Sequence, residues 1–355
     1  MAKREVEDIK DVSKQIIREE PVEFINTGST MVNLAASGKG RSGGWARGRV
    51  INIVGDGSSG KTALALETFA QAYYHLRETK SKIFPPVKNL ILKYNNVERV
   101  MDFPLATMYK QKFVDAVDWR TTREIEQFGR DFARSCLKLK DGDCLIYALD
   151  SLDSLIAHDS KVRFEDAAEE DREEDTSYGT EKPKYASKFF SHICGLMDGK
   201  DATLIIISQV RQIINPMTFG KKIYRTGGKA LDFYTHQVAW LAEVEKTARV
   251  FRGEKRPYGI RSKAKFERNK TAKPFREAEF RILFDYGVDD LGSMIDWYWG
   301  PKKEKLDFDG EKFTRAELID YVEENDLIDV VQDMCEKEWQ EIEKEIAPKR
   351  KPRFE

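Results

Sequence analysis

The sequence predicts an α/β protein whose core is a mostly parallel, twisted sheet with helices on both faces. Short apolar runs alternate with segments of helical length, which is typical of parallel strands joined by crossover helices. A glycine-rich turn, GDGSSGKT at residues 55–62, lies between one such run and a helix-forming stretch, as phosphate-binding loops do. From about Asp296 the pattern becomes acidic, Trp-containing and helical, which predicts a small helical region after the core.

The composition fits a soluble globular protein with a highly charged surface. Of the 355 residues, 34% are charged and 41% are hydrophobic. The formal net charge of −1 argues against a globally basic protein, so affinity for nucleic acid must come from a local basic surface. No apolar stretch approaches the roughly 20 residues that span a bilayer, and the charged N-terminus is not a secretory signal. We therefore expect a cytoplasmic protein with no membrane partner.

The first part of the chain is expected to hold a short amphipathic helix and a linker. Apolar side chains recur there at helical spacing, at Val6, Ile9, Val12 and Ile16. Pro21 ends this pattern. The following stretch, to about Arg49, is rich in glycine and serine and is predicted to be mostly loop.

The core is predicted from alternating strands and helices. The expected parallel strands are Val50–Val54, Leu90–Tyr94, Leu145–Leu149 and Thr203–Ile207. The expected helices include Ala63–Leu76 and Thr122–Leu139. Two further β-like segments, Gln237–Val244 and Glu277–Phe284, extend the sheet. The acid-rich residues 165–184 have no apolar period and are predicted to form a mobile loop.

The glycine-rich turn satisfies the G-x-x-x-x-G-K-[ST] pattern of a phosphate loop. Its residues are Gly55, Asp56, Gly57, Ser58, Ser59, Gly60, Lys61 and Thr62. Backbone N–H groups of such a turn and of the following helix surround phosphate oxygens. Lys61 is expected to neutralise phosphate charge and the Thr62 hydroxyl to bind Mg²⁺. The turn therefore predicts binding of ATP and Mg²⁺.

Two carboxylates are candidates to complete this site. Asp150 ends the apolar run LIYALD and can hold Mg²⁺, and it is favoured over Asp153, which we expect to face solvent or to cap a helix. Glu98 follows the second strand, where a carboxylate can activate water. From the pattern alone, Glu98 is equally well an ordinary surface glutamate.

Seven segments follow one another between residues 24 and 290: FINTGSTMVNLAASG, GRVINIVGDGSSGKTALAL, NNVERVMD, CLIYALDS, LIIISQVR, RTGGKALDFY and ERNKTAKPFREAEFRILFDYGV. In these segments and in their order, the chain resembles the bacterial RecA-type recombinases. The divergence elsewhere is typical of a distant relative, such as a phage-encoded one acting in a bacterial or phage-infected cytosol. The resemblance implies a RecA-like P-loop ATPase core over residues 24–290. It is preceded by an oligomerisation helix and linker (1–23) and followed by a small helical domain and tail (291–355).

The resemblance also implies roles for single residues. Glu98 falls on the position of the catalytic glutamate. Gln209 matches the glutamine that senses the γ-phosphate and relays its presence to the next loop. Arg268 and Lys270 match two lysines that reach the neighbouring subunit's nucleotide, although the first is Arg here. Phe233 matches an interface aromatic.

DNA is expected to bind at RQIINPMTFGKKIYRTGG, residues 211–228. The candidate contacts are Arg211, Ile214, Phe219, Lys221, Lys222, Arg225, Gly227 and Gly228. Cations there would neutralise phosphates, apolar side chains would wedge between bases, and the two glycines would bring backbone N–H groups to a phosphate. The alternative is a generic basic surface loop with a buried apolar anchor.

Two departures from the family pattern are evident. The acid-rich residues 165–175 lie where a first DNA-binding loop is expected. Three alternatives stay open: the acidic run swings aside, it acts as a DNA mimic that damps binding, or Lys182, Lys184 and Lys188 make the DNA contacts. The family pattern also has an aromatic residue near Asp102 that stacks on the adenine. The local order Asp102-Phe103-Pro104-Leu105 does not clearly place one there.

Together these features predict an ATP-dependent, DNA-dependent ATPase and homologous recombinase. It would form a helical filament with itself on single-stranded DNA and exchange strands with homologous double-stranded DNA. Single-strand-binding or mediator proteins are candidate partners. The alternatives are a ring-forming DNA motor or helicase of the same ATPase class, and a non-catalytic, nucleotide-switched assembly factor for DNA repair.

Overall fold

The computed structural model describes residues 22–76, 87–99, 101, 103–170, 181–212, 223–225 and 228–351. The predicted N-terminal helix therefore lies outside the described residues.

A large sheet runs through the centre of the molecule. Its strand order is β12-β11-β10-β9-β3-β7-β6-β4-β5, and β8 pairs with β7. The strands are β3 (Val50–Gly55), β4 (Asn89–Asn96), β5 (Val117–Arg120), β6 (Asp143–Asp150), β7 (Ala202–Gln212), β8 (Ile223–Arg225), β9 (Gln237–Phe251), β10 (Glu254–Asn269), β11 (Glu277–Leu283) and β12 (Gly287–Asp289). The run from β9 to β5 is parallel and the run from β9 to β12 is antiparallel.

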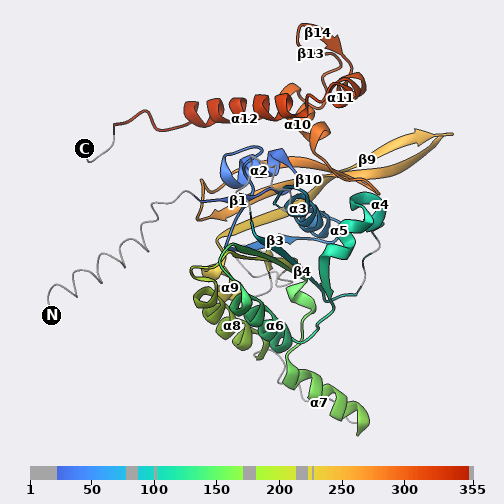
Figure 1. Ribbon diagram of the computed structural model, residues 1–355. Coiled ribbons are helices and arrows are strands. Elements are labelled where there is room, and N and C mark those ends of the chain that lie inside the picture. The colour runs from blue at the N-terminus through green and yellow to red at the C-terminus, as the bar shows by residue number, and fades with distance from the viewer. Residues whose placement is uncertain are drawn as a thin grey trace, which may run out of the picture.

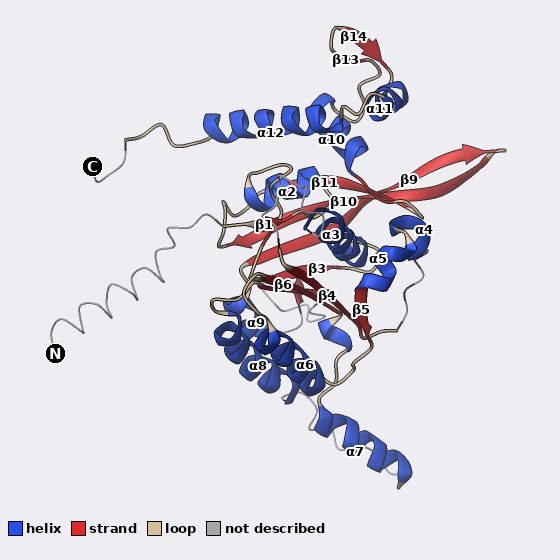
Figure 2. Cartoon of the chain, in the orientation of Figure 1, coloured by secondary structure: helices blue, strands red, loops and turns tan. Residues whose placement is uncertain are grey.

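Helices cover both faces of the sheet (Figures 1 and 2). On one face lie α3 (Lys61–Leu76), α4 (Leu105–Tyr109) and α5 (Gln111–Ala116), and on the other α6 (Ile125–Lys138), α8 (Glu181–Met197) and α9 (Gly228–Tyr234). Side chains of a strand alternate between faces, so β6 sends Ile146 and Ala148 into one core and Leu145 and Tyr147 into the other. The predicted α/β class and doubly covered sheet are confirmed.

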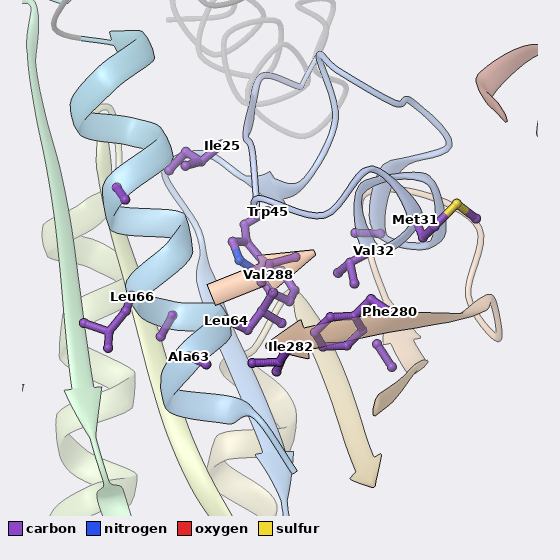
Figure 3. Close-up of a cluster of buried hydrophobic side chains, with 14 of the residues drawn as sticks. Ile25, Met31, Val32, Trp45, Ala63, Leu64, Leu66, Phe280, Ile282 and Val288 are labelled. Carbon is purple, nitrogen blue, oxygen red and sulfur yellow. The ribbon is translucent and has the colours of Figure 1, made fainter. Parts of the chain in front are cut away.

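The glycine- and serine-rich segment before β3 is more ordered than predicted. Residues expected to be mostly loop contain the helix α2 (Thr30–Ser37), between the short strands β1 (Phe24–Ile25) and β2 (Trp45–Ala46). Ser29 caps the helix at its start, and Gly38, with a φ of 74°, ends it. Val32 of α2, Leu64 of α3 and Phe280 of β11 meet in the core (Figure 3). The prediction missed α2 because the helix is only eight residues long.

The acid-rich segment is helical where the structure describes it. A loop was predicted over residues 165–184, but α7 (His158–Glu169) runs through its first residues and α8 begins at Glu181. The start of α7 is tied to α6 through Glu124, which lies 3.0 Å from Lys161 Nζ and 3.1 Å from His158 Nδ1. This anchor comes from a distant part of the sequence, so local composition gave no indication of it.

Strands β9 and β10 form a hairpin that projects beyond the rest of the sheet (Figure 1). Strand β3 pairs with β9 only as far as Leu241, and β11 pairs with β10 only from Gly259. The remainder of the hairpin is a two-stranded ribbon, with Phe251 70% exposed near its tip. The strand predicted to end at Val244 continues to Phe251.

The C-terminal region packs over α2 and the antiparallel end of the sheet (Figure 1). It consists of α10 (Asp290–Trp299), a small hairpin of β13 (Leu306–Phe308) and β14 (Glu311–Phe313), α11 (Arg315–Glu324) and α12 (Ile328–Glu345). The predicted α-rich C-terminal region is present. None of the helices in the described part of the chain combines the length and apolar character that crossing a bilayer requires.

Candidate functional site

The glycine-rich turn has the strand–turn–helix structure that its sequence predicts. Strand β3 ends at Gly55 and α3 begins at Lys61. The Ser59 hydroxyl donates to the Asp56 carbonyl at 2.8 Å, which closes the turn. Ser58 and Gly60 adopt φ values of 62° and 89°. These left-handed positions curl the backbone around the N-terminus of α3, where unpaired N–H groups favour an anion.

Lys61 supplies a cation inside this turn. Its ammonium group is largely buried and donates to the Asp56 carbonyl. Burial lowers the pKa of Lys61, and the nearby carboxylate of Asp150 opposes that effect. The turn, the helix terminus and the lysine together form an arrangement suited to a phosphate chain.

Thr62 and Asp150 are brought together, as expected for a magnesium site. The Thr62 hydroxyl donates to Asp150 Oδ2 at 2.8 Å. Burial raises the pKa of Asp150, while hydrogen bonds from Tyr94 and Thr62 act in the opposite direction. A hydroxyl and a carboxylate are hard oxygen ligands of the kind that Mg²⁺ prefers, with phosphate oxygens and waters completing the coordination. These residues fit a magnesium–nucleotide complex.

Glu98 lies beside Asp150 and is held by several donors. Its Oε1 accepts from the Ser154 hydroxyl at 2.8 Å, from the Ser151 hydroxyl at 3.0 Å and from Gln209 Nε2 at 3.4 Å. The sequence prediction missed both serines, although they closely follow Asp150 in the sequence ALDSLDS. Glu98 and Gln209, which the family resemblance paired with the phosphate loop, therefore share one site.

Asp153 does not have the place predicted for it. It was expected to face solvent or to cap a helix, but its Oδ2 accepts the backbone N–H of Gln209 at 2.7 Å. The residue lies in the short 3₁₀ helix Leu152–Ser154, just after β6. It therefore links the turn after β6 to β7, the strand that leads into the predicted DNA-binding segment.

A pocket of about 410 Å³ opens beside the phosphate loop. It is lined by Ser58, Gly60, Lys61, Thr62, Ala63, Phe103, Glu243, Lys246, Pro257, Ile260, Ile282 and Phe284. Two aromatic rings, those of Phe103 and Phe284, thus border the pocket next to the phosphate site. Asp102, the predicted contact to the base, lies outside the described residues. Phe284 was not predicted because it is far from Phe103 in the sequence.

Arg268 and Lys270 lie at the end of the strands opposite to the phosphate loop, where β3 and β9 begin. The Lys270 backbone N–H donates to His236, whose own N–H donates to Val50, the first residue of β3. The side chains of Arg268 and Lys270 donate to the carbonyls of Asp232 and Phe233 at the end of α9. They are therefore remote from the phosphate loop of their own chain.

Most of the predicted DNA-binding segment is outside the described residues. This applies to Ile214, Phe219, Lys221, Lys222 and Gly227. The backbone of Arg211 extends β7 and pairs with Tyr224 of β8, and Gly228 begins α9.

Arg225 differs from its prediction. It was expected to contact DNA phosphates, but it is buried, bonds to Asn52 of β3 and forms an ion pair with Asp232. Burial lowers the pKa of Arg225, and Asp232 opposes that effect. Arg225 is thus placed to hold β8 and α9 against the sheet rather than to meet a polyanion.

Comparisons with known proteins give a consistent result. Residues 8–81 and 141–289 match the family model of the RecA N-terminal domain. The chain is 30% identical to "Protein RecA" of a Nitratiruptor species over 310 residues, which cover 87% of this chain and 79% of that protein. It is 30% identical to "Protein RecA" of Wolinella succinogenes over 291 residues, 82% of this chain and 73% of the relative.

A solved structure supports the fold. The crystal structure of the RadB recombinase superposes with a TM-score of 0.50 at 15% identity, covering 75% of this chain and 98% of that one.

Proposed function

This chain belongs to the RecA family, and on that premise we propose that it is an ATP-dependent homologous recombinase. In this proposal it polymerises on single-stranded DNA, pairs that strand with homologous duplex and exchanges strands. One observation carries the proposal. Lys61, the Thr62–Asp150 pair and Glu98 meet at one edge of the sheet, and Gln209 joins them from the strand that enters the predicted DNA segment.

These positions support the following catalytic roles. The turn and Lys61 bind the phosphate chain. Glu98 orients and deprotonates a water that attacks the γ-phosphorus, and the bond from the γ-phosphorus to the β,γ-bridging oxygen breaks so that ADP leaves. Ser151 and Ser154 hold the Glu98 carboxylate in place through their hydroxyl groups. Thr62 and Asp150 would hold Mg²⁺, which would neutralise phosphate charge. The adenine enters the adjacent pocket between Phe103 and Phe284.

The link from nucleotide to DNA is short. The Gln209 side chain donates to Glu98, and Arg211 follows two residues later at the start of the predicted DNA segment. A γ-phosphate that binds Gln209 changes the constraint on this strand end and so favours one arrangement of the segment. The DNA contacts assigned to Arg211, Ile214, Phe219, Lys221, Lys222, Gly227 and Gly228 belong to this proposal.

The positions of Arg268 and Lys270 support assembly into a filament. Because Arg268 and Lys270 are at the end of the strands opposite the phosphate loop, they can serve a nucleotide only across a subunit boundary. Phe233, 70% exposed beside them, offers an apolar contact to the same neighbour. The N-terminal helix, residues 1–23 with their linker, would dock on the adjacent core, and residues 291–355 would form a separate small domain.

The test is a joint-molecule assay between homologous strands, with ATP and Mg²⁺. We expect joint molecules with the wild type, none with Lys61→Ala, and unchanged yield with Lys312→Ala, which removes an exposed lysine of β14. Electron microscopy of the same reactions should show helical filaments. Absence of homology-dependent pairing by the wild type, or pairing that survives Lys61→Ala, contradicts the proposal, and closed rings would favour the motor alternative.

A further inference from the structure

Tyr94 is a buried tyrosine whose hydroxyl group reaches the proposed magnesium site. It lies in β4 with a side chain that is 0% exposed, and its OH donates to Asp150 Oδ2 at 2.7 Å. In the sheet Tyr94 is paired with Ala148 of β6. Asp150 lies two residues beyond Ala148 and therefore on the same face, which is the face that α3 covers.

The ring of Tyr94 is fixed from two sides. Phe69 of α3 packs edge-on at a centroid distance of 5.5 Å, and Trp119 of β5 packs at 5.4 Å. The Trp119 indole N–H in turn donates to the Val114 carbonyl at 2.9 Å. Because its neighbours leave the ring little freedom, the position of the hydroxyl group is set by the packing of the sheet and α3.

Two hydroxyl groups converge on one carboxylate oxygen. Asp150 Oδ2 accepts from Thr62 at 2.8 Å and from Tyr94 at 2.7 Å. The Thr62 bond joins two groups that both belong to the proposed magnesium site, whereas Tyr94 belongs to the hydrophobic core. Tyr94 thus connects the orientation of the Asp150 carboxylate to a rigid part of the fold.

We infer that Tyr94 is a positioning residue for magnesium binding, one that holds Asp150 in the orientation that pairs it with Thr62. This inference rests on the proposed nucleotide site. Outer-shell partners that orient ligating carboxylates change metal affinity or activity by about 10- to 100-fold when they are removed. If Tyr94 served only to fill the core, it would need its ring. Removing its hydroxyl group would then have no effect on Mg²⁺ binding.

The chain contains a matched control for this inference. Tyr147 of β6 is also 0% exposed, and its OH donates to a carboxylate, Asp131 Oδ2, at 2.8 Å. Its side chain belongs to the core on the other face of the sheet, away from the phosphate loop. Tyr94→Phe and Tyr147→Phe therefore remove the same chemical group from the same kind of environment, and they differ in whether the acceptor belongs to the proposed magnesium site.

The experiment compares binding of a fluorescent, non-hydrolysable ATP analogue in Mg²⁺ and in EDTA for wild type and both variants. We expect Tyr94→Phe to lose about 10-fold of the affinity gained from Mg²⁺ and to need correspondingly more Mg²⁺ for half-saturation. Its affinity in EDTA should be unchanged. Tyr147→Phe should match the wild type in all three quantities, and thermal unfolding should report the folding of each variant.

The inference is overturned if Tyr94→Phe and Tyr147→Phe show the same Mg²⁺ dependence, or if the wild type gains no affinity from Mg²⁺. A Tyr94→Phe protein that loses affinity equally in Mg²⁺ and EDTA also overturns it, because the residue would then support the pocket as a whole. Strand exchange is measured separately. A wild type that binds Mg²⁺ and ATP but pairs no DNA contradicts the proposed function and leaves this inference intact.

Discussion

The carboxylate of Asp153 accepts the backbone N–H of Gln209 at 2.7 Å, and the side chain of the same Gln209 donates to Glu98 at 3.4 Å. One residue is thus bound through its backbone to the turn after β6 and through its side chain to the proposed catalytic carboxylate. In the proposed function, a γ-phosphate that binds Gln209 would therefore alter the position of the strand end from which the predicted DNA segment starts.

Replacing Asp153 with Ala should therefore weaken the coupling between nucleotide and DNA. We expect the preference of single-stranded DNA for the ATP-bound over the ADP-bound protein to fall at least about 5-fold, the lower end of ordinary coupling between sites. Asp153→Asn keeps an acceptor oxygen and should restore part of the preference. Fluorescence anisotropy of labelled DNA measures both. An unaltered preference in Asp153→Ala would show that this hydrogen bond carries no coupling.

Glu98→Gln should separate ATP binding from ATP turnover. The amide keeps the size of the side chain but cannot take a proton, so phosphate release should slow by about 10²- to 10⁴-fold while nucleotide affinity stays near the wild-type value. Ser154→Ala should have a smaller effect, because Ser151 still donates to Glu98 at 3.0 Å. Equal turnover by wild type and Glu98→Gln would exclude Glu98 as the base.

Two of the three glycines of the phosphate loop, Gly57 and Gly60, should differ sharply in their tolerance of a side chain. Gly60 has a φ of 89°, and a Cβ there would lie 2.3 Å from Ile282 Cδ1, whereas a Cβ at Gly57 meets nothing within 4 Å. Gly60→Ala should lower the free energy of unfolding by about 1–3 kcal/mol and weaken ATP binding. Gly57→Ala serves as the control, with stability close to wild type. Urea unfolding and nucleotide titration compare the two variants. Similar losses of stability and of ATP affinity in Gly60→Ala and Gly57→Ala would contradict the prediction.

Asp290 should make folding stability depend on pH. Burial raises its pKa to about 6, while bonds from Thr30 and Gln332 act in the opposite direction. Its unfolded pKa is about 3.9. Between these values the folded protein binds a proton that the unfolded chain does not. The free energy of unfolding should therefore fall as pH rises through that window, by up to about 3 kcal/mol.

Asp290→Asn should flatten this part of the pH profile, since the amide does not titrate. Asp307→Asn, at an exposed position of β13, should leave it unchanged. Chemical denaturation at intervals from about pH 4 to pH 7 gives the comparison. Two results would be inconsistent with a buried, proton-binding carboxylate: a wild-type free energy of unfolding that rises over the window, or a fall that persists in Asp290→Asn.

The parts of the site that could be predicted are those set by local sequence. The phosphate loop is contiguous. Asp150 is the last residue of β6 and Glu98 follows β4, and the carboxyl ends of neighbouring parallel strands lie at the same end of the sheet. Tyr94 and Phe284 could not be predicted, because their contacts depend on the register of strands and on the return of the chain from a distant segment. Arg225 was assigned from its charge, while its burial is set by Asn52 and Asp232.

The placement of Arg268 and Lys270 at the end of the strands opposite the phosphate loop has a consequence for the proposed filament. When each nucleotide is completed by the next copy, the last copy in line has a phosphate loop that no neighbour completes, and the first has two cations with no nucleotide to serve. The two ends of such a polymer are chemically different. Growth and loss of subunits should then proceed at different rates at the two ends, so the chain itself gives the polymer a direction.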